Sequence, residues 1–163
     1  MNYHNITKDD MLNGDGLRVV LWVAGCEQDC FNCQNPQTHP QDSGILFDEQ
    51  AQQELFEALK PNYISGLTLS GGHPLEEYNL DECTRIAKEF KQSFPNKTLW
   101  VYTGFVWNQV KDFEIMKYID VLCDGRFVES LKDNNAHWVG SINQRVINVQ
   151  ESLKKGEIVL HEQ

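Results

Sequence analysis

The sequence predicts an α/β protein whose sheet is mostly parallel, either a partial barrel or an open sheet. Runs rich in apolar and β-branched residues alternate with segments whose apolar residues recur at helical spacing. Such alternation favours right-handed crossovers between parallel strands. The composition, with 40% hydrophobic and 23% charged residues, is that of an ordinary globular protein.

The individual elements follow from local patterns. The run from Leu17 to Ala24 is nearly all apolar, as expected of a strand covered on both faces. Asp48 suits the N-cap of a helix that ends near Leu59, before Pro61. Further strands are expected at 64–70, 99–102 and 119–123, helices at 80–90 and 106–116, and a β-hairpin formed by 145–149 and 158–161 around Lys154-Lys155-Gly156.

Length and charge limit the function classes. A chain of 163 residues is expected to form one domain, residues 1–163. The sequence has no run of about 18 apolar residues and no secretory signal, so we expect a cytoplasmic protein without a membrane partner. The net charge of −10 repels a phosphate backbone, which argues against nucleic acid as a partner.

Polar and cysteine-rich segments follow each of the four expected strands. They are Cys26 to Cys33, Ser70-Gly71-Gly72-His73-Pro74, Thr103-Gly104 and Asp124-Gly125. In parallel α/β folds the loops at the carboxyl ends of the strands converge on one crevice. We therefore expect the chemistry of this protein at that edge.

Three cysteines crowd into the first of these segments. Thiolates are soft ligands that suit zinc or an iron–sulfur cluster, and Cys26, Cys30 and Cys33 are spaced to surround one cluster face. A 4Fe-4S cluster with three local ligands leaves one iron open to a non-protein ligand. The alternatives are a zinc site with His39 as the fourth ligand, or buried free thiols.

The glycine pair in the second segment suggests a close backbone approach. Residues without a Cβ atom neither clash with a ligand nor restrict φ, and Pro74 fixes the exit of the turn. A Gly-Gly pair alone is weak evidence, but beside a three-cysteine loop it becomes more specific. His73 in this turn is expected to face solvent.

Together these motifs resemble the radical S-adenosylmethionine superfamily, through Cys-x3-Cys-x2-Cys after one strand and Gly-Gly-x-Pro after the next. Within that superfamily the chain resembles the anaerobic ribonucleoside-triphosphate reductase activating proteins. The segments that carry this resemblance are Asn13-Gly14-Asp15-Gly16-Leu17-Arg18, Leu67 to Gly72, Trp100 to Phe105, Asp124-Gly125-Arg126-Phe127 and Gly140-Ser141-Ile142-Asn143-Gln144.

The resemblance implies a single-domain partial (β/α) barrel that activates a partner enzyme. Cys26, Cys30 and Cys33 would hold a 4Fe-4S cluster, and no catalytic side chain is implied beyond the cluster and S-adenosylmethionine. The implied partner is the large subunit of a class III anaerobic ribonucleotide reductase, on which a glycyl radical is formed, and an unidentified electron donor reduces the cluster. The residues implied to bind S-adenosylmethionine are Gly71, Gly72, His73, Pro74, Thr103 and Asn143.

The chain also departs from the family pattern. Asp15 stands where the family usually has Pro, Gln34 where an aromatic is common, His73 where an acid is usual and Val139 where an Arg is usual. The superfamily's aromatic before the third cysteine is absent, because Asn32 occupies that position and Phe31 lies one place earlier.

Other functions remain open at this level. The chain could activate another glycyl radical enzyme or act on a small molecule, although its shortness favours a macromolecular substrate. A zinc module without enzymatic activity is the alternative from a different class.

Overall fold

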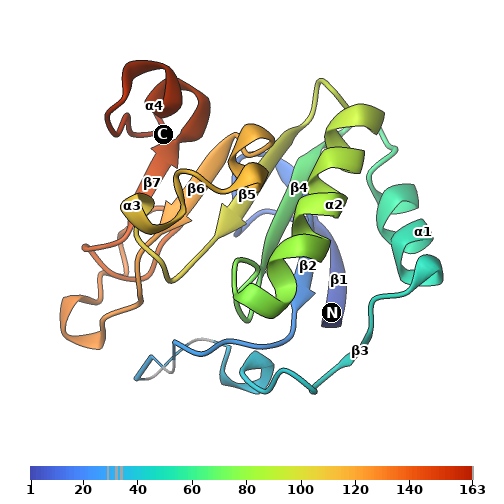
Figure 1. Cartoon of the computed structure of the whole chain (residues 1–163), viewed down its shortest axis with the longest axis horizontal. Helices are drawn as coiled ribbons and strands as arrows, with labels where there is room; N and C mark the ends of the chain where they lie inside the picture. The colour runs from blue at the N-terminus through green and yellow to red at the C-terminus, as the bar shows by residue number, and fades with distance from the viewer. Residues whose placement is uncertain (29, 32, 34, 163) are drawn as a thin grey trace.

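The computed structural model describes residues 1–28, 30–31, 33 and 35–162, and its centre is a mixed sheet (Figure 1). The seven strands lie in the order β3-β1-β2-β4-β5-β6-β7. Neighbours among β2, β4, β5 and β6 are parallel, whereas β1, β3 and β7 pair antiparallel. The strand bounds are β1 (Asn2–Asp10), β2 (Leu17–Val23), β3 (Ile45–Leu46), β4 (Ile64–Gly71), β5 (Thr98–Tyr102), β6 (Val121–Asp124) and β7 (Arg145–Asn148).

The sheet is not closed, since within the described residues β3 and β7 form its two edges. This confirms the predicted α/β fold with a mostly parallel sheet in a partial barrel. The four parallel strands are the four that the sequence predicts, and their carboxyl ends meet at one edge of the sheet.

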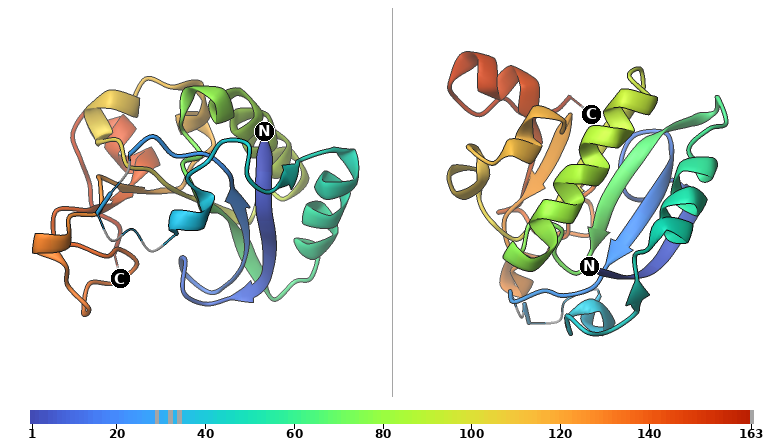
Figure 2. Two further views of the ribbon diagram at one scale, coloured as in Figure 1. Left: turned by 90° about the horizontal axis from the view of Figure 1, so that it is seen from below. Right: turned by 45° about the vertical axis from the view of Figure 1, so that its right-hand side comes forward.

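Helices cover one face of the sheet (Figures 1 and 2). Alternate strand residues such as Leu21, Leu69 and Val101 point into this main core, where they meet Leu55 and Phe90 of the helices. As predicted, the Asp48 side chain caps the first helix by accepting the Ala51 N–H. The helices are α1 (Glu49–Ala58), α2 (Glu77–Ser93), α3 (Trp107–Val110) and α4 (Val149–Lys155), with 3-10 turns η1 (Pro36–Thr38), η2 (Glu114–Lys117) and η3 (Glu129–Leu131).

The opposite, inner face of the sheet carries a second, smaller cluster. Trp100, Val121, Cys123 and Val146 are buried there, and Trp138 and Val139, from the segment between η3 and β7, pack against them. Irregular chain thus covers part of this face.

Arg18 ties the parallel strands together from the inner face. Its guanidinium is fully buried and donates to Thr68 Oγ1, Thr98 Oγ1 and the carbonyl oxygens of Asp15, Leu67 and Thr98. Burial lowers its pKa to about 10, which leaves the group charged at neutral pH. Arg18 therefore has a structural role at the amino-terminal half of the sheet.

Two predicted elements differ from the structure. The expected helix at 106–116 is divided into α3 and η2, because the backbone at Phe113 is extended (φ −67°, ψ 143°). The expected C-terminal hairpin is right in its pairing and wrong in its connection. The Asn148 N–H donates to the Val159 carbonyl oxygen and the His161 N–H to that of Val146, but α4 joins the two segments, begun by the Asn148 side chain and ended by Gly156 in the left-handed conformation. A single antiparallel bridge joins Ile147 to Leu160 beyond that helix.

Strand β1 was not expected from the sequence. Tyr3 and Ile6 are both buried, although they lie three residues apart, because the pairing with β2 is irregular between Tyr3 and Asn5. This irregularity disrupts the period of two that identifies strands.

In the part of the chain that the structure describes, none of the helices combines the length and the apolar character required to cross a bilayer.

Candidate active site

A cavity of about 480 Å³ lies at the carboxyl ends of the parallel strands and extends along the inner face of the sheet. This size is typical of small-molecule sites. Seven of the residues proposed from the sequence line the cavity. They are Cys26, Cys30, Cys33, Gly71, Gly72, His73 and Thr103.

The cysteine loop begins where β2 ends. Gly25 has a φ of +99°, and its N–H and that of Cys26 donate to the carbonyl oxygens of Thr38 and His39 at 2.6 and 2.9 Å. The thiols of Cys26, Cys30 and Cys33 are free and half-buried. Burial raises the pKa of Cys26 to about 11.

This donor set fits an iron–sulfur cluster. Three thiols of one loop line a single cavity and leave room beside them, whereas Cys83 and Cys123 are fully buried in the cores, as their places on an apolar stripe and a strand predicted. Coordination of iron would drive deprotonation of the Cys26 thiol despite its burial.

Gly71 and Gly72 bring the end of β4 against the end of β2. Gly71 has a φ of +104°, and a Cβ atom there would lie 2.7 Å from the Val23 nitrogen. At Gly72 a Cβ atom would lie 2.7 Å from the carbonyl oxygen of Gly25. The glycines thus permit backbone contact with the start of the cysteine loop.

The expectation that His73 faces solvent is wrong. Its side chain is 1% exposed, and its ring packs against Phe105 with the ring centroids 4.5 Å apart. Nδ1 lies 2.9 Å from Glu76 Oε1, and Nε2 lies 2.5 Å from Thr103 Oγ1. The turn folds inward because the His73 N–H donates to Gly25 and because buried Asn79 donates to the His73 carbonyl oxygen.

The Thr103–Gly104 turn after β5 contacts both neighbouring loops. The Thr103 hydroxyl reaches His73, and the Thr103 N–H donates to the Cys123 carbonyl oxygen at 3.0 Å. A Cβ atom at Gly104 would lie 2.7 Å from the Gln28 side chain, so the cysteine loop packs directly on this turn.

Two residues proposed from the sequence are not among those that line the cavity. Pro74 is buried behind the glycine turn, and Asn143 is exposed, with its side chain donating to the Arg126 carbonyl oxygen at 2.9 Å. Gln144, the next residue, lines the cavity instead, and its Oε1 accepts the N–H groups of Gly140 and Ser141.

The residues that differ from the pattern described in the sequence analysis lie in different structural environments. Asp15 pairs with His161 at 2.7 Å, and Val139 packs on the second cluster. Gln34 and Asn32 lie outside the described residues.

Sequence reasoning missed Tyr102 and Trp138, which also line the cavity. Tyr102 alternates with Val101 and so points to the inner face, which strand parity could have revealed. Trp138 has a φ of +74°, and its buried Nε1 has no hydrogen-bond partner among the described residues. Strained backbone and unsatisfied buried donors are concentrated at functional sites, but no local pattern marks Trp138 in the sequence.

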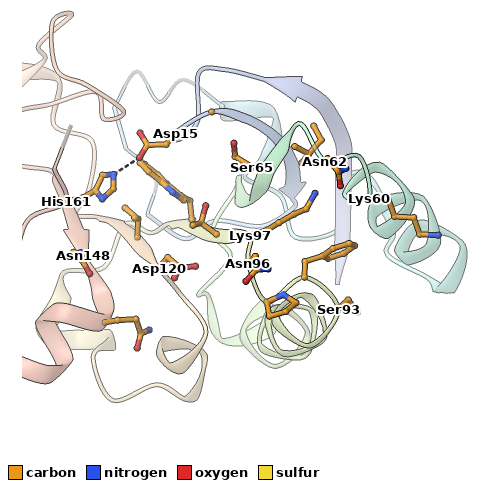
Figure 3. A pocket seen from close by; sticks show the side chains of 18 residues that line it. Asp15, Lys60, Asn62, Ser65, Ser93, Asn96, Lys97, Asp120, Asn148 and His161 are labelled. Carbon is orange, nitrogen blue, oxygen red and sulfur yellow. Dashed lines mark hydrogen bonds and ion pairs between the residues drawn. The ribbon is translucent and has the colours of Figure 1, made fainter.

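A second hollow, of about 820 Å³, lies at the opposite end of the parallel strands (Figure 3). The charged groups around it pair within the protein. Asp15 meets His161, Asp120 meets Lys91 at 2.5 Å, and Lys97 donates to the carbonyl oxygens of Leu59 and Pro61. The thiols and the glycine turn lie at the other end, which identifies the smaller cavity as the candidate active site.

Comparisons with known proteins show to which family the chain belongs. Residues 12–147 match the family model of a 4Fe-4S single cluster domain. The chain is 40% identical over 146 residues to the anaerobic ribonucleoside-triphosphate reductase-activating protein of Enterobacteria phage T4, covering 90% of this chain and 93% of that protein. The proteins of the same name from Haemophilus influenzae and Escherichia coli K12 are 36% and 35% identical, and cover 88% and 90% of this chain and 96% and 97% of their own lengths.

The range matched by the family model, residues 12–147, includes the cysteine loop and the glycine turn, and the relatives cover 88% to 90% of this chain. The chain therefore belongs to the family of anaerobic ribonucleoside-triphosphate reductase-activating proteins.

Proposed function

We propose that this protein cleaves S-adenosylmethionine reductively with a 4Fe-4S cluster and thereby generates a glycyl radical on an anaerobic ribonucleotide reductase. The observation that carries the proposal is the meeting of three free thiols and the Gly71–Gly72 turn in one cavity. The family names and the 4Fe-4S domain support the same function.

The residues that line the cavity would have different roles. Cys26, Cys30 and Cys33 would hold three irons of the cluster and leave the fourth for S-adenosylmethionine. When bound, these two groups supply the one-electron chemistry that breaks a carbon–sulfur bond of the sulfonium. Gly71 and Gly72 would offer backbone carbonyls to the ammonium of the cofactor. Thr103 borders the cavity on the next strand.

The open inner face suits a macromolecular partner. Met11 and Leu12 line the same cavity and are 67% and 80% exposed. Exposed apolar residues beside a site are typical of a docking surface. We assign this opening to the glycine-bearing segment of a class III reductase large subunit, and we place the reaction in the cytoplasm with an electron donor whose identity is open.

Anaerobic reconstitution tests the proposal. We expect about four irons and four sulfides per chain, and after reduction the release of methionine and 5′-deoxyadenosine from S-adenosylmethionine, measured by mass spectrometry. Cys26→Ala, Cys30→Ala and Cys33→Ala should abolish both. Cys83→Ala is the matched control and should cost only packing, about 1 kcal/mol.

Bound zinc without sulfide would contradict the proposal and support the zinc module. Loss of the cluster in Cys83→Ala would overturn the ligand assignment.

A further inference from the structure

A buried imidazole and a buried carboxylate form a pair beside the cavity. His73 follows the glycine turn, and Glu76 precedes the first residue of α2. The side chains of His73 and Glu76 are 1% and 10% exposed, and Nδ1 lies 2.9 Å from Oε1. A buried carboxylate is retained only with partners, and here the imidazole of His73 is one partner of Glu76.

The contacts of the ring fix its tautomer. The Gly104 N–H donates to His73 Nε2 at 3.3 Å, so Nε2 is an acceptor. The proton of the neutral ring therefore lies on Nδ1, which donates to Glu76. Burial lowers the pKa of His73, which favours this neutral form. The imidazole thus connects the start of α2 to the turn after β5.

The carboxylate in turn holds the cysteine loop. Glu76 Oε1 accepts the backbone N–H of Glu27 at 3.1 Å, directly after Cys26. The thiol sulfur of Cys26, a ring nitrogen of His73 and a carboxylate oxygen of Glu76 all lie within 4.8 Å of one another. A charge this close to a sulfur ligand, in a site partly withdrawn from water, is weakly screened and changes the electronic properties of the metal centre.

We propose that His73 and Glu76 are positioning residues that orient Cys26, and that the Glu76 carboxylate lowers the reduction potential of the cluster at this loop. The inference rests on the proposed function for the presence of the cluster. The two residues that carry the inference lie three positions apart in the chain, and their side chains meet beside the cavity. A negative charge beside the cluster stabilises its oxidised form, which is the direction of the expected shift.

The first test changes charge without changing shape. Glu76→Gln keeps an oxygen for the Glu27 N–H but removes the charge, and Glu77→Gln is the matched control because Glu77 is exposed one residue further on. The midpoint potential of the reconstituted cluster is titrated by electron paramagnetic resonance without S-adenosylmethionine. We expect a more positive potential in Glu76→Gln and an unchanged one in Glu77→Gln. Equal potentials in the wild type and both variants would overturn the electrostatic role.

The second test exchanges the acidic and the imidazole side chains between positions 73 and 76. His73→Asp would place two carboxylates against each other and remove the acceptor of Gly104, so cluster content should fall at least fivefold. Combining His73→Asp with Glu76→His restores an acid and an imidazole in reversed order and should recover most of the iron and sulfide. We expect both variants to fold, because the backbone at position 73 is held by hydrogen bonds with Gly25 and Asn79 that do not involve the ring. No recovery in the double variant would contradict the pairing.

A third measurement covers the case in which Glu76→Gln takes up no cluster. Hydrogen exchange of the Glu27 amide in the apo-protein should be at least tenfold faster in Glu76→Ala, which removes the acceptor of this N–H, than in the wild type, and an unchanged rate would overturn the positioning role. These measurements require no cofactor cleavage. A wild-type protein that holds the cluster but does not cleave S-adenosylmethionine would therefore contradict the proposed function and not this inference.

Discussion

At the level of single residues, the glycine turn shows why small size is required at the site. Gly72 has an ordinary φ, yet any side chain there would meet the Gly25 carbonyl oxygen. Gly156 has the opposite character, with a φ of +72° and, among the described residues, no heavy atom within 4 Å of the position that a Cβ atom would take. Substitutions at Gly72 and Gly156 therefore distinguish the effect of a steric clash at the site from the effect of backbone strain at a helix end.

We predict that Gly72→Ala reduces S-adenosylmethionine cleavage at least tenfold, about 1.4 kcal/mol in the barrier, because the start of the cysteine loop must move. Gly156→Ala should lower stability by about 1 kcal/mol, through left-handed strain alone, and leave cleavage unchanged. Product assays and urea unfolding measure the two effects. Equal cleavage in both variants would contradict the close approach of the two loops.

Sequence reasoning finds residues whose chemistry is local. Cys26, Cys30, Cys33 and the glycine pair stand in motifs, and the structure brings them to one cavity. The burial of His73 could not be predicted, because it depends on Phe105 and Thr103, which lie some thirty residues away in the chain.

At the level of elements, long-range hydrogen bonds determine the features that the local sequence pattern does not predict. The parallel strands and the cap at Asp48 were predictable because their signals are local and periodic. The helix that connects the two C-terminal segments was not predictable, because Asn148 and Gly156 fit helix caps as well as turns. Strand β1 was not predicted because its buried residues do not alternate. Arg18 makes the clearest long-range contacts, since its hydrogen bonds join β2 to β4 and β5.

We predict that Arg18→Met lowers the free energy of unfolding by about 3 kcal/mol or more, because buried carbonyl and hydroxyl groups lose their donor. The carbonyl oxygens of Leu67 and Thr98 are the main groups affected. Arg85→Met is the control, because its ion pairs with Glu82 and Glu89 lie on the surface of α2 and such pairs contribute less than about 1 kcal/mol. Urea unfolding compares them, and similar losses would contradict the structural role of Arg18.

At the level of the whole molecule, the two ends of the sheet differ in kind. The charged groups at the amino-terminal end form pairs, whereas the carboxyl-terminal end holds the thiols, the glycine turn and an exposed apolar border. The net charge of −10 makes the protein predominantly acidic at neutral pH. The open sheet therefore gathers the thiols and the glycine turn at one edge, which is where the proposed partner would dock.

The most direct test of this account mixes the reduced, reconstituted protein and S-adenosylmethionine with a class III ribonucleotide reductase from the same source. We predict a glycyl-radical resonance on the reductase, and its loss when the carboxyl-terminal radical glycine of the reductase is changed to alanine. An undiminished signal in that variant, or no signal with the wild-type reductase despite active cleavage of S-adenosylmethionine, would contradict the proposed function.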